Sequence, residues 1–288
     1  MHPDDFIAAP SANATSRILP AGLSVRWLGT AGFELKAQGT TLLIDPYLTR
    51  VGLGAYLRGP IRPDVERIAR EVPEADAIVV GHSHFDHVMD VPDIARRTGA
   101  RVIGSRSTAN LMQASGIPAS QVTLCEGGEV IEVGPFKITM IPSEHSRFAL
   151  GGKVPYAGDI PCSCELPVRG SGYKCGQVFG IAVELGGFCA YHMGSANLID
   201  DAIIHKDIDL FLMGISGRHA TDNYIPRVLR RLAPRAVLPM HYDNFFRDAA
   251  RPMKLLPLTR FGRFVDEVTG FDQQITIRTL SIGGSLDS

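Results

Sequence analysis

The six residues 82–87, with the sequence HSHFDH, constrain the fold of this chain more than any other stretch. They follow an apolar run typical of a buried strand, and at the two-residue period of a strand His82, His84 and Asp86 would project to the same side. His87 falls at the turn into a helix and approaches from another direction. Surface histidines on a polar loop are the alternative, but three of the chain's nine histidines lie in these six residues. The spacing predicts a metal site with room for two clustered metals.

The composition is that of ordinary globular material. The chain has 288 residues, of which 45% are hydrophobic, enough for one large domain or two small ones. Its 29 Lys and Arg residues balance 30 Asp and Glu residues, so it lacks the basic field of a typical nucleic-acid binder. We therefore expect no nucleic-acid partner, and nothing in the sequence indicates a membrane span.

The N-terminal segment and the cysteines both bear on the location of the protein in the cell. Residues 1–22 are rich in Ala, Ser and Pro and lack the basic and apolar regions of a signal peptide, so we expect an N-terminal arm, one domain at 23–288 and a cytoplasmic location. Cys162, Cys164 and Cys175 do not fit a secreted disulfide framework, and we expect reduced thiols. A small thiolate metal site is the alternative, but it lacks a clear fourth ligand.

Short apolar runs alternate with turn signals along the chain and predict two sheets flanked by helices. Strands are expected at 23–29, 32–37, 40–45, 77–81, 100–103, 129–133, 136–141, 178–185, 188–192, 209–213 and 236–240. Helices are expected at 63–71, 90–98, 107–115 and 222–232. The stretch between His145 and Gln177 is rich in Gly, Pro and Cys and has little periodicity. Because long structureless loops are often lids or binding loops, we expect residues 147–176 to cover the active site and set substrate choice.

Two more histidines follow predicted strands. His145 comes after the apolar run 138–141, and His241 comes directly after 237–240. A lone histidine in such a place is usually a loop residue, but these two repeat the pattern of residues 82–87. Together with the first stretch they supply five histidines and one aspartate.

The chain resembles the metallo-β-lactamase superfamily of hydrolases over nearly its whole length. The segments that carry the resemblance are VRWLGTAGFEL, TTLLIDPYL, DAIVVGHSHFDHVMD, IPSEHS and PRAVLPMHYDNF. Within the superfamily it looks most like the branch that holds ascorbate-6-phosphate lactonases and the N-acylphosphatidylethanolamine-hydrolysing phospholipase D. The resemblance implies an α/β (α+β) fold, a four-layer αββα sandwich whose strand-end loops hold the metals. It also implies one metal on His82, His84 and His145, and a second on Asp86, His87 and His241.

One position departs from the family pattern. The family places a bridging aspartate in a Gly-Asp pair, and here Ser195 follows Gly194 instead. A Gly-Asp pair occurs at Gly158-Asp159, but it comes before the hairpin at 178–192, so chain order argues against Asp159 as the substitute. We therefore expect two divalent metals with the second site weaker and partly occupied. Nitrogen-rich ligand sets suit Zn²⁺, while Mn²⁺, Fe²⁺ and Ni²⁺ stay open.

Further residues are candidates for supporting roles. Asp45 either orients a ligand histidine from outside the ligand set or is simply the first residue of an Asp-Pro turn. His192 is expected to be a supporting or surface histidine. The residues that we expect at the substrate are Arg147, Lys153, Arg218, His219 and Tyr242. Solvated surface charge is the alternative for Arg147, Lys153 and Arg218, and a supporting or surface role is the alternative for His219.

These observations predict a metal-dependent hydrolase that uses a metal-activated hydroxide on an ester, lactone or phosphodiester bond, with Asp86 and His241 as catalytic residues. The substrate is expected to be a small molecule, either anionic or lipid-like. The alternatives are a metal-binding regulatory module that has lost turnover, a nuclease of the superfamily, or a β-lactamase. Whether the chain forms a homo-oligomer is left open by the sequence.

Overall fold

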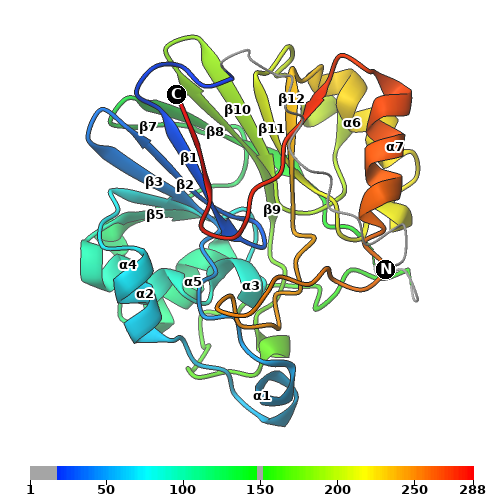
Figure 1. Ribbon diagram of the computed structural model, residues 1–288. Helices are drawn as coiled ribbons and strands as arrows, with labels where there is room; N and C mark the ends of the chain where they lie inside the picture. Colours follow the sequence, from blue (N-terminus) through cyan, green and yellow to red (C-terminus); the bar gives the residue numbers. More distant parts are fainter. Residues whose placement is uncertain (1–17, 148–151) are drawn as a thin grey trace.

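Two seven-stranded sheets pack face to face in the computed structural model, which describes residues 18–147 and 152–288 (Figure 1). The first sheet has the order β14-β1-β2-β3-β4-β5-β6. Its strands are β14 (Ser285–Asp287), β1 (Ser24–Gly29), β2 (Gly32–Ala37), β3 (Thr40–Ile44), β4 (Ala77–Val79), β5 (Arg101–Gly104) and β6 (Val122–Leu124). Strands β3 to β6 run parallel, and β14, β1, β2 and β3 are antiparallel neighbours.

The second sheet has the order β13-β12-β11-β10-β9-β8-β7. Its strands are β13 (Thr276–Ile277), β12 (Ala236–Met240), β11 (Leu210–Gly214), β10 (Phe188–Met193), β9 (Val178–Leu185), β8 (Phe136–Ser143) and β7 (Val130–Val133). Strands β10 to β13 are parallel, and β7 to β10 are antiparallel. Consequently β8, β10 and β12 all end at the same edge of this sheet.

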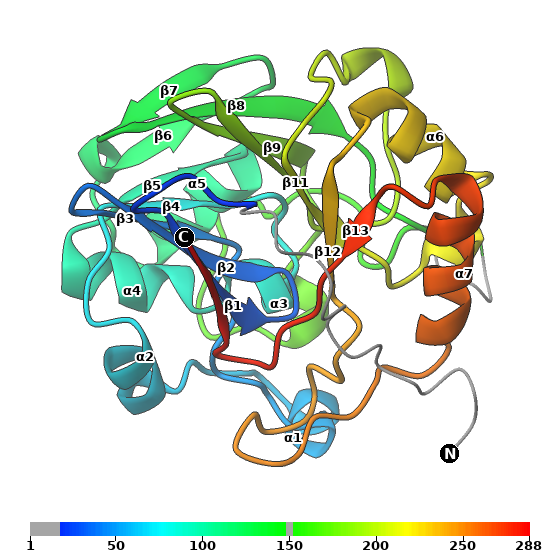
Figure 2. The ribbon, with the colours of Figure 1, turned by 45° about the horizontal axis from the view of Figure 1, so that its top comes forward.

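Helices cover the outer faces of both sheets (Figures 1 and 2). The α-helices are α1 (Leu53–Arg58), α2 (Val65–Glu71), α3 (Phe85–Val88), α4 (Val91–Thr98), α5 (Arg106–Ala114), α6 (Tyr224–Leu232) and α7 (Phe261–Phe271). Short 3-10 turns lie at Ala119–Gln121, Gly170–Gly172, Asp200–Ala202 and Arg218–Ala220. Helices α2, α4 and α5 pack on the first sheet, and α6 and α7 pack on the second. This arrangement confirms the predicted four-layer αββα sandwich.

One apolar core joins the two sheets. It contains Trp27 and Phe33 from the first sheet and Ile181 and Phe211 from the second, all at most 1% exposed. Leu19 is also buried in this core, so the last residues of the expected N-terminal arm at 1–22 pack on the domain; residues 1–17 lie outside the described part of the chain. Within the described residues, no helix is long and apolar enough to cross a membrane.

The structure corrects the expected strand through residues 82–87. Strand β4 ends at Val79, and the HSHFDH stretch forms a short loop followed by α3, which begins at Phe85. His84 has the extended backbone of a residue that precedes a helix, with φ −64° and ψ 153°. The ligands therefore project from a loop and one helical turn, and the two-residue alternation of a strand does not apply to them.

Candidate metal centre

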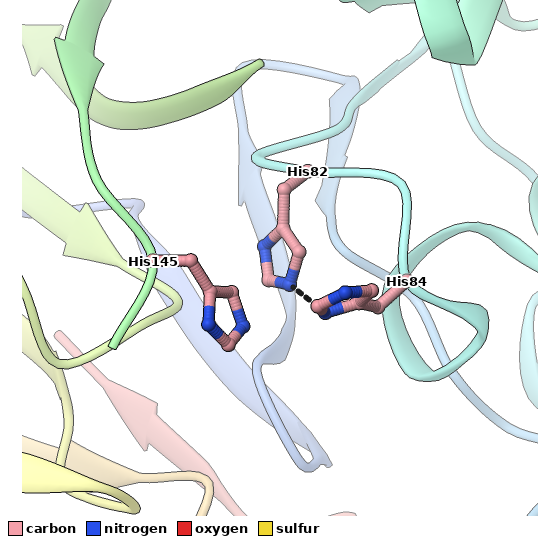
Figure 3. Close-up of side chains that lie close together, drawn as sticks. All are labelled: His82, His84 and His145. Atoms are coloured by element: carbon pink, nitrogen blue, oxygen red, sulfur yellow. Dashed lines mark hydrogen bonds between the residues drawn. The ribbon is translucent and has the colours of Figure 1, made fainter. Parts of the chain in front are cut away.

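Three histidines from two segments converge at one edge of the sandwich. His82 and His84 lie in the loop after β4, and His145 lies just after β8; Figure 3 shows their rings pointing toward one another. One ring nitrogen of each lies within 4.8 Å of the others. His82 Nε2 and His84 Nδ1 are 3.1 Å apart, close to the separation of about 3.3 Å between two nitrogens on one tetrahedral zinc.

Backbone carbonyls fix the orientation of two rings in this first trio. His84 Nε2 donates to the carbonyl oxygen of Pro155 at 2.9 Å, and His145 Nδ1 donates to the carbonyl oxygen of Ser146 at 2.7 Å. Each bond places the ring proton on the outer nitrogen and leaves the inner nitrogen with its lone pair. The first trio thus presents free lone pairs toward a common point.

A second trio lies beside the first. Asp86 and His87 come from α3, and His241 follows β12; their ligand atoms also lie within 4.8 Å of one another. Asp86 Oδ2 is 3.2 Å from His241 Nε2 and 3.8 Å from His87 Nε2. The rings of His82 and His87 are 3.8 Å apart, which brings the two trios into contact.

Asp45, which directly follows β3, orients the ring of His87 by a hydrogen bond. Its Oδ2 accepts from His87 Nδ1 at 2.7 Å, and its Oδ1 accepts from the backbone N–H of Gly81 at 2.6 Å. A Cβ added to Gly194 would lie 2.9 Å from Asp45 Oδ2 and 3.2 Å from His87 Cε1, so the close approach of β10 requires glycine there. The other ring nitrogen of His87, Nε2, is buried and has no hydrogen-bond partner among the described residues.

The protonation of the histidines differs between the trios. Burial lowers the pKa of His84 to about 4 and that of His145 to about 3, and it also holds the pKa of His82 well below its ordinary value. For His87 burial acts in the same direction, but the carboxylates of Asp45 and Asp86 raise its pKa above the ordinary value. The first trio is therefore neutral near pH 7, whereas His87 attracts a proton.

Asp86 is ionised in this setting. Burial alone would raise the pKa of its carboxyl group, but the neighbouring His87 and His241 hold that pKa well below its usual range. A buried carboxylate, converging imidazoles with outward-pointing ring protons and an unpartnered His87 nitrogen form a donor set that fits divalent metals. The two trios contain the residues that the sequence named as ligands, and their binding of metal stays a prediction.

Ser195 lies beside the first trio. Its Oγ accepts from the backbone N–H of Ser146 at 3.0 Å, next to the ligand His145, and it lines the same cavity as the histidines. Asp159 belongs to neither trio. Its carboxylate accepts a hydrogen bond from Ser107 Oγ at 3.0 Å.

A buried ion pair supports His241. Arg50 donates to Asp243 Oδ2 at 2.5 Å and to Thr30 Oγ1 at 3.1 Å, and Asp243 accepts from the backbone N–H of Thr30 at 3.0 Å. The backbone N–H of His241 donates to the carbonyl oxygen of Thr30 at 2.8 Å. This network holds His241 in a left-handed conformation, with φ 60°, that a non-glycine residue adopts only when its surroundings impose it.

Both trios open into one large cavity of about 1010 Å³. Pro155 and Tyr156 line it, so the segment after His145 does border the metal centre; residues 148–151 of the expected covering loop lie outside the described residues. Tyr156 is also bonded to Tyr56 of α1, with their hydroxyl oxygens 2.7 Å apart.

The structure separates the expected substrate residues into two groups. Arg147 and His219 line the cavity, and both are exposed. Lys153 is exposed but lies outside the cavity lining. The cavity residues that sequence reasoning missed include Tyr56, Phe245, Phe246, Arg247 and Arg251. The sequence did offer a signal for four of them, because the NFFRDAAR segment at 244–251 follows His241 after only two residues.

Arg218 and Tyr242 require correction. Arg218 is 3% exposed, pairs with Glu267 at 2.9 Å and donates to backbone carbonyls, so its guanidinium is committed to structure. Tyr242 is fully buried against Trp27, and its hydroxyl donates to the carbonyl oxygen of Leu280. Neither lines the cavity.

A family model described as "Beta-lactamase superfamily domain" matches residues 24–241. A UPF0173 metal-dependent hydrolase from Anaeromyxobacter dehalogenans is 30% identical over 241 residues, which cover 80% of this chain and 78% of the relative. A UPF0173 metal-dependent hydrolase from Thermococcus onnurineus is also 30% identical, covering 80% and 89%. The chain belongs to the UPF0173 metal-dependent hydrolase group of the β-lactamase superfamily.

The comparison with solved structures agrees on the fold. Igni18, a metallo hydrolase from Ignicoccus hospitalis, is 21% identical, covers 92% of this chain and 97% of its own, and has a TM-score of 0.57. These findings confirm the expected superfamily. The narrower branch of lactonases and phospholipase D stays a prediction.

Proposed function

We propose that this chain hydrolyses an ester, lactone or phosphodiester bond of a small molecule at two divalent metals, for which Zn²⁺ is the best match to the donors. The observation that carries the proposal is the pair of contacting candidate ligand trios that border one cavity. The two trios would hold divalent metals, which would supply Lewis-acid polarisation of the scissile group and lower the pKa of bound water.

The side chains have separate tasks. Asp86 remains ionised and offers a carboxylate oxygen that can accept a hydrogen bond from the attacking water and orient it. His241 Nε2 lies 3.2 Å from Asp86 Oδ2 and fixes the position of that carboxylate. Asp45 keeps the ring proton of His87 on Nδ1. At the cavity, the exposed guanidinium of Arg147 is suited to an anionic group of the substrate.

The proposed place of action is the cytoplasm. All five cysteines, which lie in the described residues, are free thiols, and Cys162 is exposed. Free thiols of this kind are typical of a reducing compartment.

The test is metal reconstitution with a small substrate panel. Protein stripped by a chelator is reloaded with Zn²⁺, Mn²⁺, Fe²⁺ or Ni²⁺, and bis(4-nitrophenyl) phosphate, a homoserine lactone and nitrocefin are assayed. We expect metal-dependent turnover of the phosphodiester or the lactone. Turnover of nitrocefin alone would favour a β-lactamase, and no turnover with two metals bound would favour a regulatory module.

A further inference from the structure

A row of aromatic rings leads away from the metal centre along the cavity. The ring of Phe245 lies 5.3 Å from that of His241, edge to face, and the ring of Phe246 lies 4.6 Å from that of Phe245. The ring of Tyr56, on α1, lies 5.2 Å from that of Phe246. These three side chains, Phe245, Phe246 and Tyr56, form what we call the aromatic row, and all three line the cavity.

Phe85 anchors this row from the protein side. It is 5% exposed, and its ring lies 5.0 Å from Tyr56, 5.9 Å from Phe246 and 6.0 Å from Phe245. Because Phe85 directly precedes the ligand Asp86 in α3, one short helix positions both a metal ligand and the support of the row. The position of the row relative to the metals is thus fixed by packing.

Core packing alone does not explain the aromatic row. Phe261 and Phe264 of α7 serve the core and are fully buried, whereas Phe245 and Phe246 keep part of their surface open to the cavity. Farther along the lining, Leu53 and Leu258 are 52% and 64% exposed. Large apolar side chains that border a cavity in this way mark a surface that an apolar ligand covers.

The size of the cavity suits such a ligand. Its volume of about 1010 Å³ lies at the upper end of the range for small-molecule sites, about 300–1,000 Å³. Five of the six candidate ligands, all except His82, line it, and exposed Arg147 and Arg251 supply positive charge elsewhere in the lining. The cavity therefore combines the candidate metal centre with an extended apolar surface.

We propose that the aromatic row binds an extended hydrocarbon chain of the substrate while the scissile bond lies at the metal centre. This inference rests on the hydrolase proposed above and narrows its substrates to amphipathic esters, lactones or phosphodiesters. The position of Phe245 supports this placement of the hydrocarbon chain. Its ring contacts that of His241, so a chain attached to the reacting group would meet the aromatic row directly.

The test measures binding, without turnover, of methyl-, butyl- and octylphosphonate to the zinc-loaded full chain by calorimetry. The phosphonate group goes to the metals, and each further methylene that is buried on the row should raise the affinity about fourfold. In Phe246→Ala this dependence on chain length should weaken, while methylphosphonate binds as before. Phe271→Ala, which removes a partly exposed ring outside the cavity, is the matched control. Zinc content is measured in every variant.

A second variant covers the case in which Phe246→Ala does not fold. Leu258 has φ 67°, a conformation that asparagine accepts readily, so Leu258→Asn should fold and should reduce octylphosphonate binding alone. Equal affinities of methyl- and octylphosphonate for the unaltered protein would overturn the inference, as would an unchanged chain-length dependence in both variants. Chain-length dependence without hydrolysis of any panel substrate would support the apolar subsite and overturn the proposed hydrolase instead.

Discussion

The two ligand trios lie in contact, yet they are supported in different ways. The first trio contains only imidazoles, and carbonyl oxygens of Pro155 and Ser146 orient two of its rings. The second trio contains the carboxylate of Asp86, and the buried carboxylate of Asp45 holds His87. Carboxylates attract protons to the second trio, whereas burial repels them from the first. A metal at the second trio must therefore compete with protons for its ligands, whereas a metal at the first trio hardly does.

Removing one ligand from each trio should give the largest effect. His145→Ala and His241→Ala should each lose one of two metals per chain, and activity should fall by more than about 100-fold, since even partners outside the ligand set are worth 10–100-fold. Metal content and turnover are measured together. His205→Ala, outside both trios, should keep two metals. Loss of both metals in either ligand variant would show that the trios do not bind independently.

Asp45→Asn should weaken only the second trio. An amide accepts the His87 ring proton less strongly than a carboxylate, so we expect a loss of about 10–100-fold in affinity for the second metal. Competition with a fluorescent zinc chelator resolves the two affinities. Asp159→Asn is the matched control, because that carboxylate bonds Ser107 away from both trios. A comparable loss at the first metal would remove the distinction drawn above.

Acidification should release the metals in order. The raised pKa of His87 means that protons should displace its metal first as the pH falls, whereas His84 and His145 take up protons only near pH 4 and pH 3. The metal-to-protein ratio should thus drop from two to one before it drops further. Dialysis at stepped pH followed by metal analysis checks this order. A single step from two to zero contradicts it.

Ser195→Asp should have the smallest effect. It supplies a carboxylate next to His145 at the position where the family resemblance implies a bridging aspartate, and we expect about a tenfold gain in affinity for the second metal. Ser195→Ala is the control, since it removes the hydroxyl without adding charge. An affinity unchanged in Ser195→Asp would mean that the side chain at this position does not reach the second metal.

The convergence of the candidate ligands could be predicted from the sequence because these residues are close in the chain or follow recognisable strands. The HSHFDH spacing, His145 after β8 and His241 after β12 all satisfy that condition. The direction of the side chains could not, since β4 ends at Val79 and the ligands then lie in a loop and α3. Because these residues do not lie in a strand, the two-residue alternation of a strand predicted the wrong directions for their side chains.

Long-range partners account for the remaining errors. Arg218 donates hydrogen bonds to Glu267 and to the carbonyl oxygens of Thr259 and Arg260, all far away in sequence. No local pattern therefore indicates that its guanidinium is already paired within the protein. The aromatic row poses the same problem. Phe245 and Phe246 follow a ligand closely, but their role depends on α1, which brings Tyr56 to them from the other end of the chain.

The hydrogen bond from His241 to Thr30 has a consequence for how the protein is made. A chain that grows from its N-terminus contains the whole first trio once His145 has been added, but it lacks the second trio until β12 is complete. His241 then closes onto the turn after β1, near the start of the domain. The residues of the second trio therefore come together only when β12 meets the start of the domain, whereas those of the first trio all lie between residues 82 and 145.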